Sequence, residues 1–276
     1  MTAADINAVG RTSLAVAALR AEETRRADAL ISDPYAESLL AAAGGAPPYP
    51  GDPSAFHAII ADQVAVRTRF LDEALLAAAG GGCRQIVLVA SGMDSRTQRL
   101  DWPDGTTVFE LDQPTVLEFK NRVLPTPARC ALHTVGVDLL GDWPAALTAA
   151  GFRPEEPTAW LVEGILYALD EPAATALLAT IGGLSAPGSQ VAFDHLEHST
   201  ALRDALTALD PELAGLWRGG PADPAAWLGA QGWQPDVREL ADVAAPLGRA
   251  THPAYDPATP GHAHSWLATA TRGNDA

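Results

Sequence analysis

The stretch QIVLVASGMDSRTQRL, residues 85–100, decides how this chain folds. It opens with five consecutive apolar residues, Ile86–Ala90, and such short runs are typical of strands buried on both faces of a sheet. A turn of small residues follows at Ser91 and Gly92, where a ligand can approach the backbone closely. A plain tight turn has the same composition. The stretch therefore predicts a buried strand and a turn. Whether a ligand binds at this turn is decided by the residues that follow the neighbouring strands.

Further apolar runs follow at intervals that leave room for helices between them. Strands are predicted at Thr106–Leu111, Leu132–Val137, Ala159–Val162 and Gln190–Asp194, and helices at Pro114–Val123, Pro144–Ala150, Pro172–Leu184 and Asp223–Gln231. Two last strands, Trp233–Leu240 and Ser265–Thr271, predict an antiparallel hairpin at the sheet edge, with Pro246–His264 as a long loop between them. The whole pattern predicts a doubly wound α/β fold with a mostly parallel seven-stranded sheet.

The first 82 residues are predicted to be a helical extension that forms part of a lid over the ligand site. Residues 83–276 are predicted to be the α/β domain, in one compact unit with the extension. Arg11–Leu30 is alanine-rich, and Asp33 precedes a proline at the start of a short helix, Tyr35–Ala43. Ser54 is expected to cap a longer helix, Ala55–Ala79, that ends at a run of glycines.

Composition narrows the class of partner. The chain has 34 acidic and 18 basic residues, a formal net charge of −16, which disfavours nucleic acid and anionic membrane surfaces. Its two cysteines form no disulfide framework, the first eight residues show no signal-peptide pattern, and no apolar run approaches the roughly 20 residues of a membrane span. We expect a cytoplasmic protein with a small-molecule partner; the sequence does not indicate an oligomeric state.

The second and third strands of the predicted sheet end in acidic residues. Asp112 lies 20 positions beyond Gly92, the spacing at which an acidic side chain accepts hydrogen bonds from ribose hydroxyls. It also precedes Pro114, so an N-cap role is equally compatible with its position. Asp138 and Leu139 follow the third strand, where a carboxylate and a backbone N–H can meet an adenine ring or can form an ordinary turn.

Two more charged residues point to the same edge of the sheet. Glu163 directly follows the buried run Trp160–Val162, and a buried carboxylate is costly unless it is paired. Arg67 lies in an apolar helical stretch, which suggests pairing with a carboxylate, either of a ligand or of a nearby acidic residue. Since ligands of open α/β sheets bind outside the carboxyl ends of the strands, these residues together predict a nucleoside-binding crevice.

Other chemistries find less support. The turn after the first strand is not a GxGxxG motif, no GxSxG elbow is present, and the histidines show no metal-ligand spacing, so we expect no metal. His195 follows the fifth strand near the predicted crevice. It is interpreted either as a packed core histidine or as a base that works near neutral pH.

Six stretches, in this order, resemble the leucine carboxyl methyltransferase family. They are RTSLAVAALRAEETRRADALISDPYAESLL, VAVRTRFLDEAL, QIVLVASGMDSRTQRL, VFELDQP, VGVDLL and WLVEGILYALDE. Within the family they are most similar to the bacterial branch that includes polyketide carboxyl O-methyltransferases. The resemblance runs from about residue 11 to the C-terminus, and several long motifs in order are far more specific than any one of them.

The resemblance implies S-adenosylmethionine (SAM) as cofactor and a role for each matching residue. Arg67 matches the arginine that grips the SAM carboxylate, a role that Arg20 shares in a more loosely matching stretch. Ala90 and Gly92 match the small residues of the first turn, and Asp112 matches the ribose-binding acid. The adenine-binding pair is matched by Asp138 and Leu139, and the acid near the methionine amino group by Glu163.

One position departs from the family pattern. The family often has Gly-Ala-Gly where this chain has Ala90-Ser91-Gly92. A methyl group at the first position is tolerated next to a ligand if the backbone φ there stays negative.

The implied function is SAM-dependent O-methylation of a small organic or polyketide-like acceptor, at a carboxylate or at a phenolic hydroxyl. A carboxylate needs no general base, whereas a hydroxyl does, and Tyr167 or His195 are the candidates on the acceptor side. Two other interpretations remain open. One is a SAM-binding sensor or scaffold without catalysis. The other is a nicotinamide-dependent reductase, although the chain lacks a Tyr-xxx-Lys pair and has a single lysine, Lys120.

Overall fold

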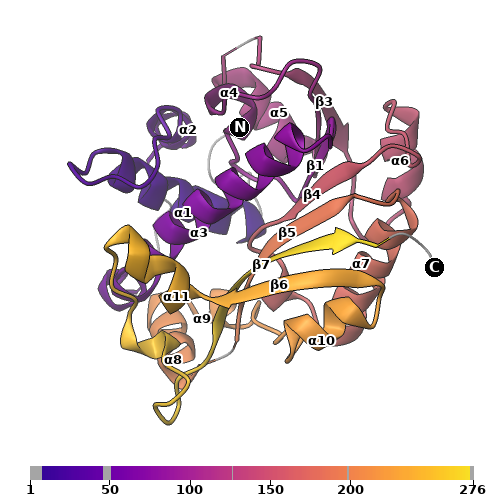
Figure 1. Ribbon diagram of the computed structural model, residues 1–276. Coiled ribbons are helices and arrows are strands. Elements are labelled where there is room, and N and C mark those ends of the chain that lie inside the picture. The colour runs from indigo at the N-terminus through magenta and orange to yellow at the C-terminus, as the bar shows by residue number, and fades with distance from the viewer. Residues whose placement is uncertain (1–7, 46–50, 126, 198, 274–276) are drawn as a thin grey trace.

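A seven-stranded sheet runs through the molecule (Figure 1). The computed structural model describes residues 8–45, 51–125, 127–197 and 199–273. In these, the strands are β1 (Gln85–Val89), β2 (Thr107–Asp112), β3 (Ala131–Gly136), β4 (Thr158–Val162), β5 (Gln190–Leu196), β6 (Trp233–Glu239) and β7 (Ser265–Arg272). They are ordered β3-β2-β1-β4-β5-β7-β6. The first five are parallel and β7 is antiparallel to both neighbours, which confirms the predicted sheet and its C-terminal hairpin.

The order of the strands reverses around β1, which lies between β2 and β4. Val89 is in register with Leu111 of β2 and with Val162 of β4. The residues that follow these three strands therefore emerge at the same level of the sheet. In open α/β sheets this switch point is where ligands bind.

Helices cover both faces of the sheet. In chain order they are α1 (Ala8–Thr24), α2 (Ala36–Ala43), α3 (Ser54–Gly80), α4 (Arg96–Arg99), α5 (Pro114–Val123), α6 (Trp143–Ala149), α7 (Glu171–Gly183), α8 (Thr200–Leu209), α9 (Pro211–Ala214), α10 (Pro224–Gly229) and α11 (Leu240–Ala244). Figure 1 shows α6, α7 and α10 on one side of the sheet, and α1, α3, α8 and α11 on the other.

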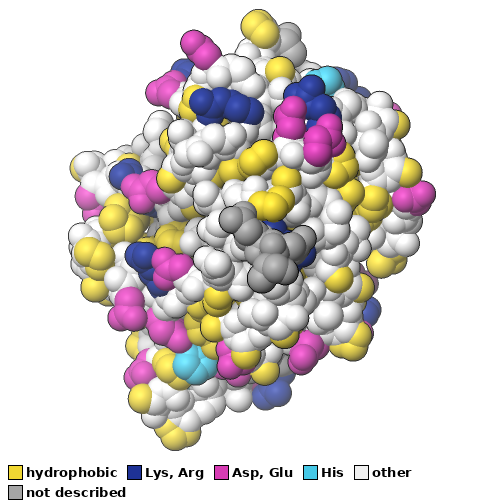
Figure 2. Space-filling view, turned by 45° about the vertical axis from the view of Figure 1, so that its right-hand side comes forward, with side chains coloured by type: hydrophobic (Ala, Val, Ile, Leu, Met, Phe, Trp, Pro, Cys, Tyr) yellow, Lys and Arg dark blue, Asp and Glu magenta, His cyan; other side chains and the backbone are white. Residues whose placement is uncertain are grey.

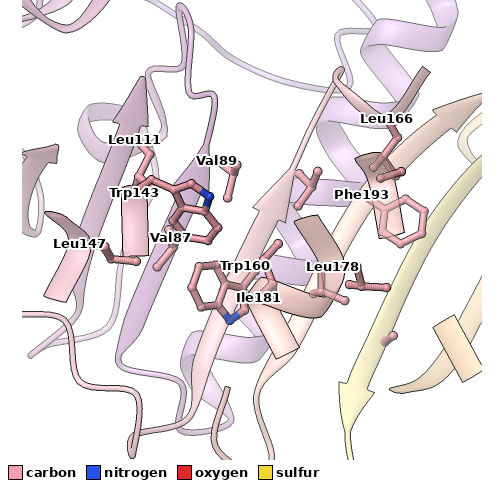
Figure 3. Packing of buried hydrophobic residues seen from close by; sticks show 14 of the residues in the cluster. Val87, Val89, Leu111, Trp143, Leu147, Trp160, Leu166, Leu178, Ile181 and Phe193 are labelled. Carbon is pink, nitrogen blue, oxygen red and sulfur yellow. The ribbon is translucent and has the colours of Figure 1, made fainter. Parts of the chain in front are cut away.

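Trp160 on β4 is the centre of the larger apolar core (Figure 3). It is fully buried, and its ring lies 6.3 Å from that of Trp143 on α6 and 5.4 Å from that of Phe152. Leu178 and Ile181 of α7 pack against the same face. Each such side chain contributes roughly 1.5–3 kcal/mol by burial, so this face anchors the sheet.

The opposite face is covered mainly by α3, the longest helix of the part that the structure describes. Leu71 and Leu75 of this helix pack with Ile86 and Leu88 of β1. The side chains of β1 alternate between the two cores, yet every residue of the strand is buried. This double burial explains the continuous apolar run that predicted the strand.

Two helix boundaries differ from the prediction. The first long helix ends at Thr24 and not at Leu30, and the Glu23 side chain accepts a hydrogen bond from the Leu30 N–H (2.7 Å) in the segment that follows. Ser54 does not cap α3: the N-cap is Pro53, and the Ser54 hydroxyl donates to Asp52 (2.8 Å). The Ser54 hydroxyl thus binds the Asp52 side chain and not a backbone N–H of the helix.

Some elements were not predicted at all. The short helix α4 and the segment with α8 and α9 were missed, and the predicted loop 246–264 contains a 3₁₀ turn at Pro253–Tyr255. At the start of α2 the N-cap is Tyr35 and not Asp33, although the Asp33 side chain accepts hydrogen bonds from the N–H groups of Tyr35 and Ala36. The first seven residues, on which the signal-peptide expectation depends, lie outside the described residues.

The charged surface is mixed rather than uniform. On the face shown in Figure 2, acidic and basic side chains lie next to one another in small groups. Among the described helices, none is both long enough and apolar enough to cross a membrane.

Candidate active site

A cavity opens at the carboxyl edge of the sheet, at the switch point around β1. It holds about 880 Å³ including its open mouth. Its walls come from α1, α3, the turn after β1 and the ends of β2 and β4. Six of the residues that the sequence predicted for cofactor binding line it: Arg20, Arg67, Ala90, Gly92, Asp112 and Glu163.

The turn after β1 has an unusual backbone. Ala90 has φ +53° and Gly92 has φ +48°, so both lie in the left-handed region. The condition of a negative φ at Ala90 is therefore not met. The Ser91 N–H donates to the carbonyl of Leu111 (3.0 Å), which ties the turn to β2. A left-handed alanine costs roughly 1–2 kcal/mol, and such strain is typical of residues held in place at functional sites.

Gly92 is required by a close approach of α1. A Cβ built on this residue would lie 2.9 Å from the Cβ of Ser13, closer than real Cβ atoms come. The glycine thus lets the first helix lie directly over the turn, where Ser13 also lines the cavity.

Asp112 connects β2 to the turn. Its Oδ2 accepts a hydrogen bond from the Gly92 N–H (2.6 Å) and its Oδ1 one from the Gln113 N–H (2.7 Å). Burial raises the pKa of this carboxyl, and the Gly92 N–H opposes that rise. The alternative of an N-cap is excluded, because Gln113 is the N-cap residue of α5. Each carboxylate oxygen has a further lone pair, so Asp112 can still accept from a pair of ribose hydroxyls.

Asp138 and Leu139 lie one strand farther out. The Val137 N–H donates to the carbonyl of Asp112 (2.8 Å), so the segment that carries Asp138 and Leu139 is attached to the end of β2. Asp138 accepts a hydrogen bond from the Leu140 N–H (2.9 Å), and Leu139 packs against the larger core. Neither is among the described residues that line the cavity. The structure does not bring this pair together with the other six.

A buried network of charges forms one end of the cavity. Arg67 pairs with Glu163 (Nη2 to Oε1, 3.0 Å) and with Asp194 (Nη1 to Oδ2, 2.9 Å). Arg96 pairs with Glu163 (Nη1 to Oε2, 2.7 Å) and with Asp72 (Nε to Oδ1, 2.7 Å). The network thus joins α3 to the ends of β4 and β5 and to α4. Arg67 thus pairs with two carboxylates of the chain itself, Glu163 and Asp194.

The two arginines decide the charge of Glu163. Burial alone would raise the pKa of this carboxyl, but Arg96 and then Arg67 outweigh burial and lower it to about 2. Glu163 is therefore ionised at any physiological pH. Arg20, at the same end of the cavity, donates to Asp33 (2.9 Å) and to the carbonyl of Met93 (2.6 Å). The negative charge of Glu163 and the positive charges of Arg20 and Arg67 thus line the same cavity.

Tyr167 also lines this cavity, in a short 3₁₀ turn after β4. Its ring stacks on that of Trp217 with 4.1 Å between centroids and 10° between planes. Burial raises the pKa of the phenol. The hydroxyl therefore stays protonated near neutral pH, and it can donate a hydrogen bond to an acceptor molecule.

His195 lies behind the cavity and not in its described lining. Its side chain is only 1% exposed and stacks on Trp266, with 5.6 Å between ring centroids. Burial lowers its pKa to about 4. The ring is thus neutral near pH 7, weakly basic and without contact to the space where an acceptor would bind.

Several residues of the site were not predicted from the sequence. Arg96 and Asp194 complete the charge network, and Lys120 forms a buried ion pair with Glu110 (2.8 Å) below the turn, 3.3 Å from the Ser91 hydroxyl. A signal existed for two of them. Arg96 belongs to the GMDSR motif, and a single lysine in a chain rich in arginine marks an unusual position.

Comparison with known proteins gives the family. The model of the family described as leucine carboxyl methyltransferase matches residues 13–182, more than half of the chain. A Frankia alni protein is 48% identical over 252 residues, which cover 87% of this chain and 89% of its own. A Mycolicibacterium smegmatis protein is 43% identical over 265 residues, which cover 87% and 88%. Both are named putative S-adenosyl-L-methionine-dependent methyltransferases.

This chain belongs to the leucine carboxyl methyltransferase family. The resemblance found in the sequence is confirmed, and with it the expectation of a SAM-dependent methyltransferase. Two solved structures bear on the fold alone. A Thermobifida fusca protein described as a putative methyltransferase has a TM-score of 0.57 at 17% identity, covering 86% of this chain and 93% of its own. A DUF574 family protein from Streptomyces avermitilis has a TM-score of 0.54 at 16% identity, covering 85% and 95%.

The chemistry of the cavity fits this cofactor. Asp112 offers carboxylate oxygens for the ribose hydroxyls, next to a turn that leaves room for a sugar. Glu163 carries the negative charge that an α-ammonium group needs, and Arg20 and Arg67 carry the positive charge that an α-carboxylate needs. These residues would hold SAM with its methionine end at the charge network.

Proposed function

We propose that this enzyme transfers a methyl group from SAM to the carboxylate of a small, polyketide-like organic acid in the cytoplasm. The observation that carries the proposal is the lack of a free base among the described residues on the acceptor side. Tyr167 has a raised pKa, Glu163 is held ionised by two arginines, and His195 lies outside the lining. A carboxylate is already a nucleophile, whereas a phenol or alcohol would need its proton removed.

Positioning then supplies most of the rate enhancement. SAM, when bound, presents an electrophilic methyl group on a positively charged sulfur. Tyr167 donates a hydrogen bond that orients the acceptor carboxylate, and α1 covers the turn through Ser13 and Gly92 and excludes water. Holding two reactants in line can contribute roughly 7–11 kcal/mol to lowering a barrier. In this proposal the helical extension, residues 1–82, is part of the lid.

The acidic surface supports a small-molecule partner. With a net charge of −16, the chain repels nucleic acid phosphates and anionic lipid headgroups. A small acid is itself an anion, but Arg20 and Arg67 and the charge on the SAM sulfur attract it locally.

The test uses the purified full-length chain with SAM and matched pairs of aromatic acids and phenols that share one ring system. We expect S-adenosylhomocysteine to form with the acids, together with a product that carries one added methyl group and is cleaved by mild base, as esters are and aryl ethers are not. Asp112→Ala should abolish turnover, whereas Asp104→Ala, at an exposed turn, should not.

Other outcomes would overturn the proposal. A base-resistant ether formed from phenols alone would assign the hydroxyl as acceptor. Tight binding of SAM without turnover of any acid or phenol would favour a sensor or scaffold. Binding of NADPH in place of SAM would favour a reductase.

A further inference from the structure

A second pocket adjoins the cofactor cavity. It shares four residues with that cavity, Thr12, Val16, Arg67 and Tyr167, which therefore lie where the two meet, and we call this place the passage. Beyond this passage it is lined by eight residues of α1, α3, β5, α8 and the segment after α9: Ala15, Leu19, Phe56, Ile60, Val64, Leu196, Leu206 and Trp217. We call this space the acceptor chamber. Its empty space, including the open mouth, is about 490 Å³.

The charged and hydroxyl groups of the acceptor chamber lie at its mouth. Arg67, Thr12 and the Tyr167 hydroxyl lie in the passage, and among the described side chains deeper in the chamber the one polar atom is the Trp217 indole nitrogen, which is buried and has no hydrogen-bond partner. Val64 and Leu206 are each 1% exposed. A charged group placed there would lose its hydration and could gain at most the single indole N–H of Trp217, which leaves a cost of several kcal/mol.

The wall beside the mouth is held in place by backbone hydrogen bonds. The N–H groups of Arg218 and Gly219 both donate to the carbonyl of Tyr167 (2.8 and 3.2 Å), and the Gly220 N–H donates to the carbonyl of Leu169 (2.9 Å). Trp217 is thereby attached to the same turn that carries Tyr167, on which its ring stacks. The chamber thus has a flat aromatic wall next to its polar mouth.

We propose that the acceptor chamber binds the apolar body of the methyl acceptor, and that the acceptor is an apolar monocarboxylic acid. The inference rests on the proposed function and narrows its substrate class. The carboxylate would stay at the mouth, near Arg67 and Tyr167, while a hydrocarbon chain or ring fills the space toward Leu206. Dicarboxylic acids are excluded because their second charge would lie in the apolar interior. Peptide carboxyl termini are excluded because their backbone N–H groups would find no side-chain acceptor among the described residues deeper in the chamber.

Leu206 and Leu202 offer a matched pair for the test. Both lie on α8, both belong to the same apolar cluster, and they are 1% and 0% exposed. Only Leu206 lines the acceptor chamber. Substituting either by alanine removes the same atoms from the same core, so a difference in substrate preference between the variants reports on the chamber and not on stability.

The experiment measures kcat and KM for methylation of a series of straight-chain monocarboxylic acids and of dicarboxylic acids with matched lengths. In the wild-type enzyme we expect kcat/KM to rise about fourfold per added methylene, up to an optimum length, mainly through KM. Leu206→Ala should move the optimum to longer chains, and the milder Leu206→Val should move it less. Leu202→Ala should leave it unchanged.

The outcomes separate this inference from the proposed function. An optimum that is the same in wild type and Leu206→Ala, or dicarboxylic acids turned over as well as monocarboxylic acids, would overturn the assignment of the chamber while leaving carboxyl methylation in place. No methyl ester from any acid, with SAM still bound, would overturn both.

Discussion

The cofactor cavity and the acceptor chamber meet at Tyr167 and Arg67, yet they are built from opposite materials. One end of the cavity is formed by ionised side chains from helices and from strand ends, paired within 3.0 Å of one another. The chamber is lined beyond its mouth by apolar and aromatic side chains, mostly of helices, whose one polar atom is the Trp217 indole nitrogen. The difference teaches that one site can bind a charged cofactor through paired ionised side chains and an acceptor through the shape of an apolar pocket.

The two regions should also fail in different ways. The ion pairs of the cavity stabilise the protein only as a complete set, because a buried charge without its partner is costly. The apolar packing around the chamber loses stability in proportion to the atoms removed and leaves charges untouched. Three predictions follow from this contrast, in order of decreasing size.

The largest effect is expected from Arg96→Met. This change leaves Asp72, Asp94 and Glu163 without one of their buried partners, so unfolding should become easier by about 3–5 kcal/mol. The control is Arg238→Met, which breaks an ion pair with Asp236 whose side chains are both more than half exposed, and which should cost about 0–1 kcal/mol. Urea unfolding followed by circular dichroism measures both. Equal losses of unfolding free energy in the two variants would contradict the stabilising role of the buried charge network.

An effect of intermediate size is expected in how the free energy of unfolding depends on pH, and it comes from His195, which stacks on Trp266. Burial lowers its pKa to about 4 from 6.5, so between these values the unfolded chain binds a proton that the folded chain does not. Stability contributed by the neutral ring is complete above about pH 6.5 and is lost as the pH falls toward 4, by about 3 kcal/mol. His195→Phe, which keeps a ring against Trp266, should reduce this dependence. Parallel curves of unfolding free energy against pH for both proteins would refute the prediction.

The smallest effect is expected at the strained turn of the cavity. Ala90→Gly relieves a left-handed alanine and should stabilise the protein by about 1 kcal/mol, with SAM affinity kept. The same substitution at Ala77, exposed on α3, should instead destabilise by about 1 kcal/mol, since glycine weakens helix interiors. Thermal unfolding with and without SAM checks both signs. Destabilisation by both changes would mean that the turn carries no strain.

The sequence predicted the cofactor cavity better than the acceptor chamber for a physical reason. Gly92 and Glu163 follow strands of the parallel part of the sheet and Asp112 ends one, and the edge at which those strands end is common to all of them. Strand order alone therefore brings them together. Asp138 followed the same rule, but β3 lies two places from β1, and its side chain closes a local turn outside the described cavity lining.

The acceptor chamber has no comparable signature. Leu19, Ile60 and Leu206 come from three helices, and their spacing shows only that each faces a core. The segment with α8 and Trp217 was not predicted as part of any site. His195 illustrates the same limit, since a histidine after a strand can face a ligand or an apolar interior, and packing against Trp266 decided which.

By itself, the sequence determined that the chain forms a mostly parallel sheet, where its buried strands lie, to which family it belongs and which charged residues lie at the strand ends. These features depend on local periodicity and on motifs that are contiguous in the chain. Only the tertiary structure decided which carboxylates Arg67 pairs with, the left-handed conformation of Ala90, the burial of His195 and the existence of the acceptor chamber. These depend on contacts between residues far apart in the chain, and a side chain's chemistry does not specify its partner until packing has placed both.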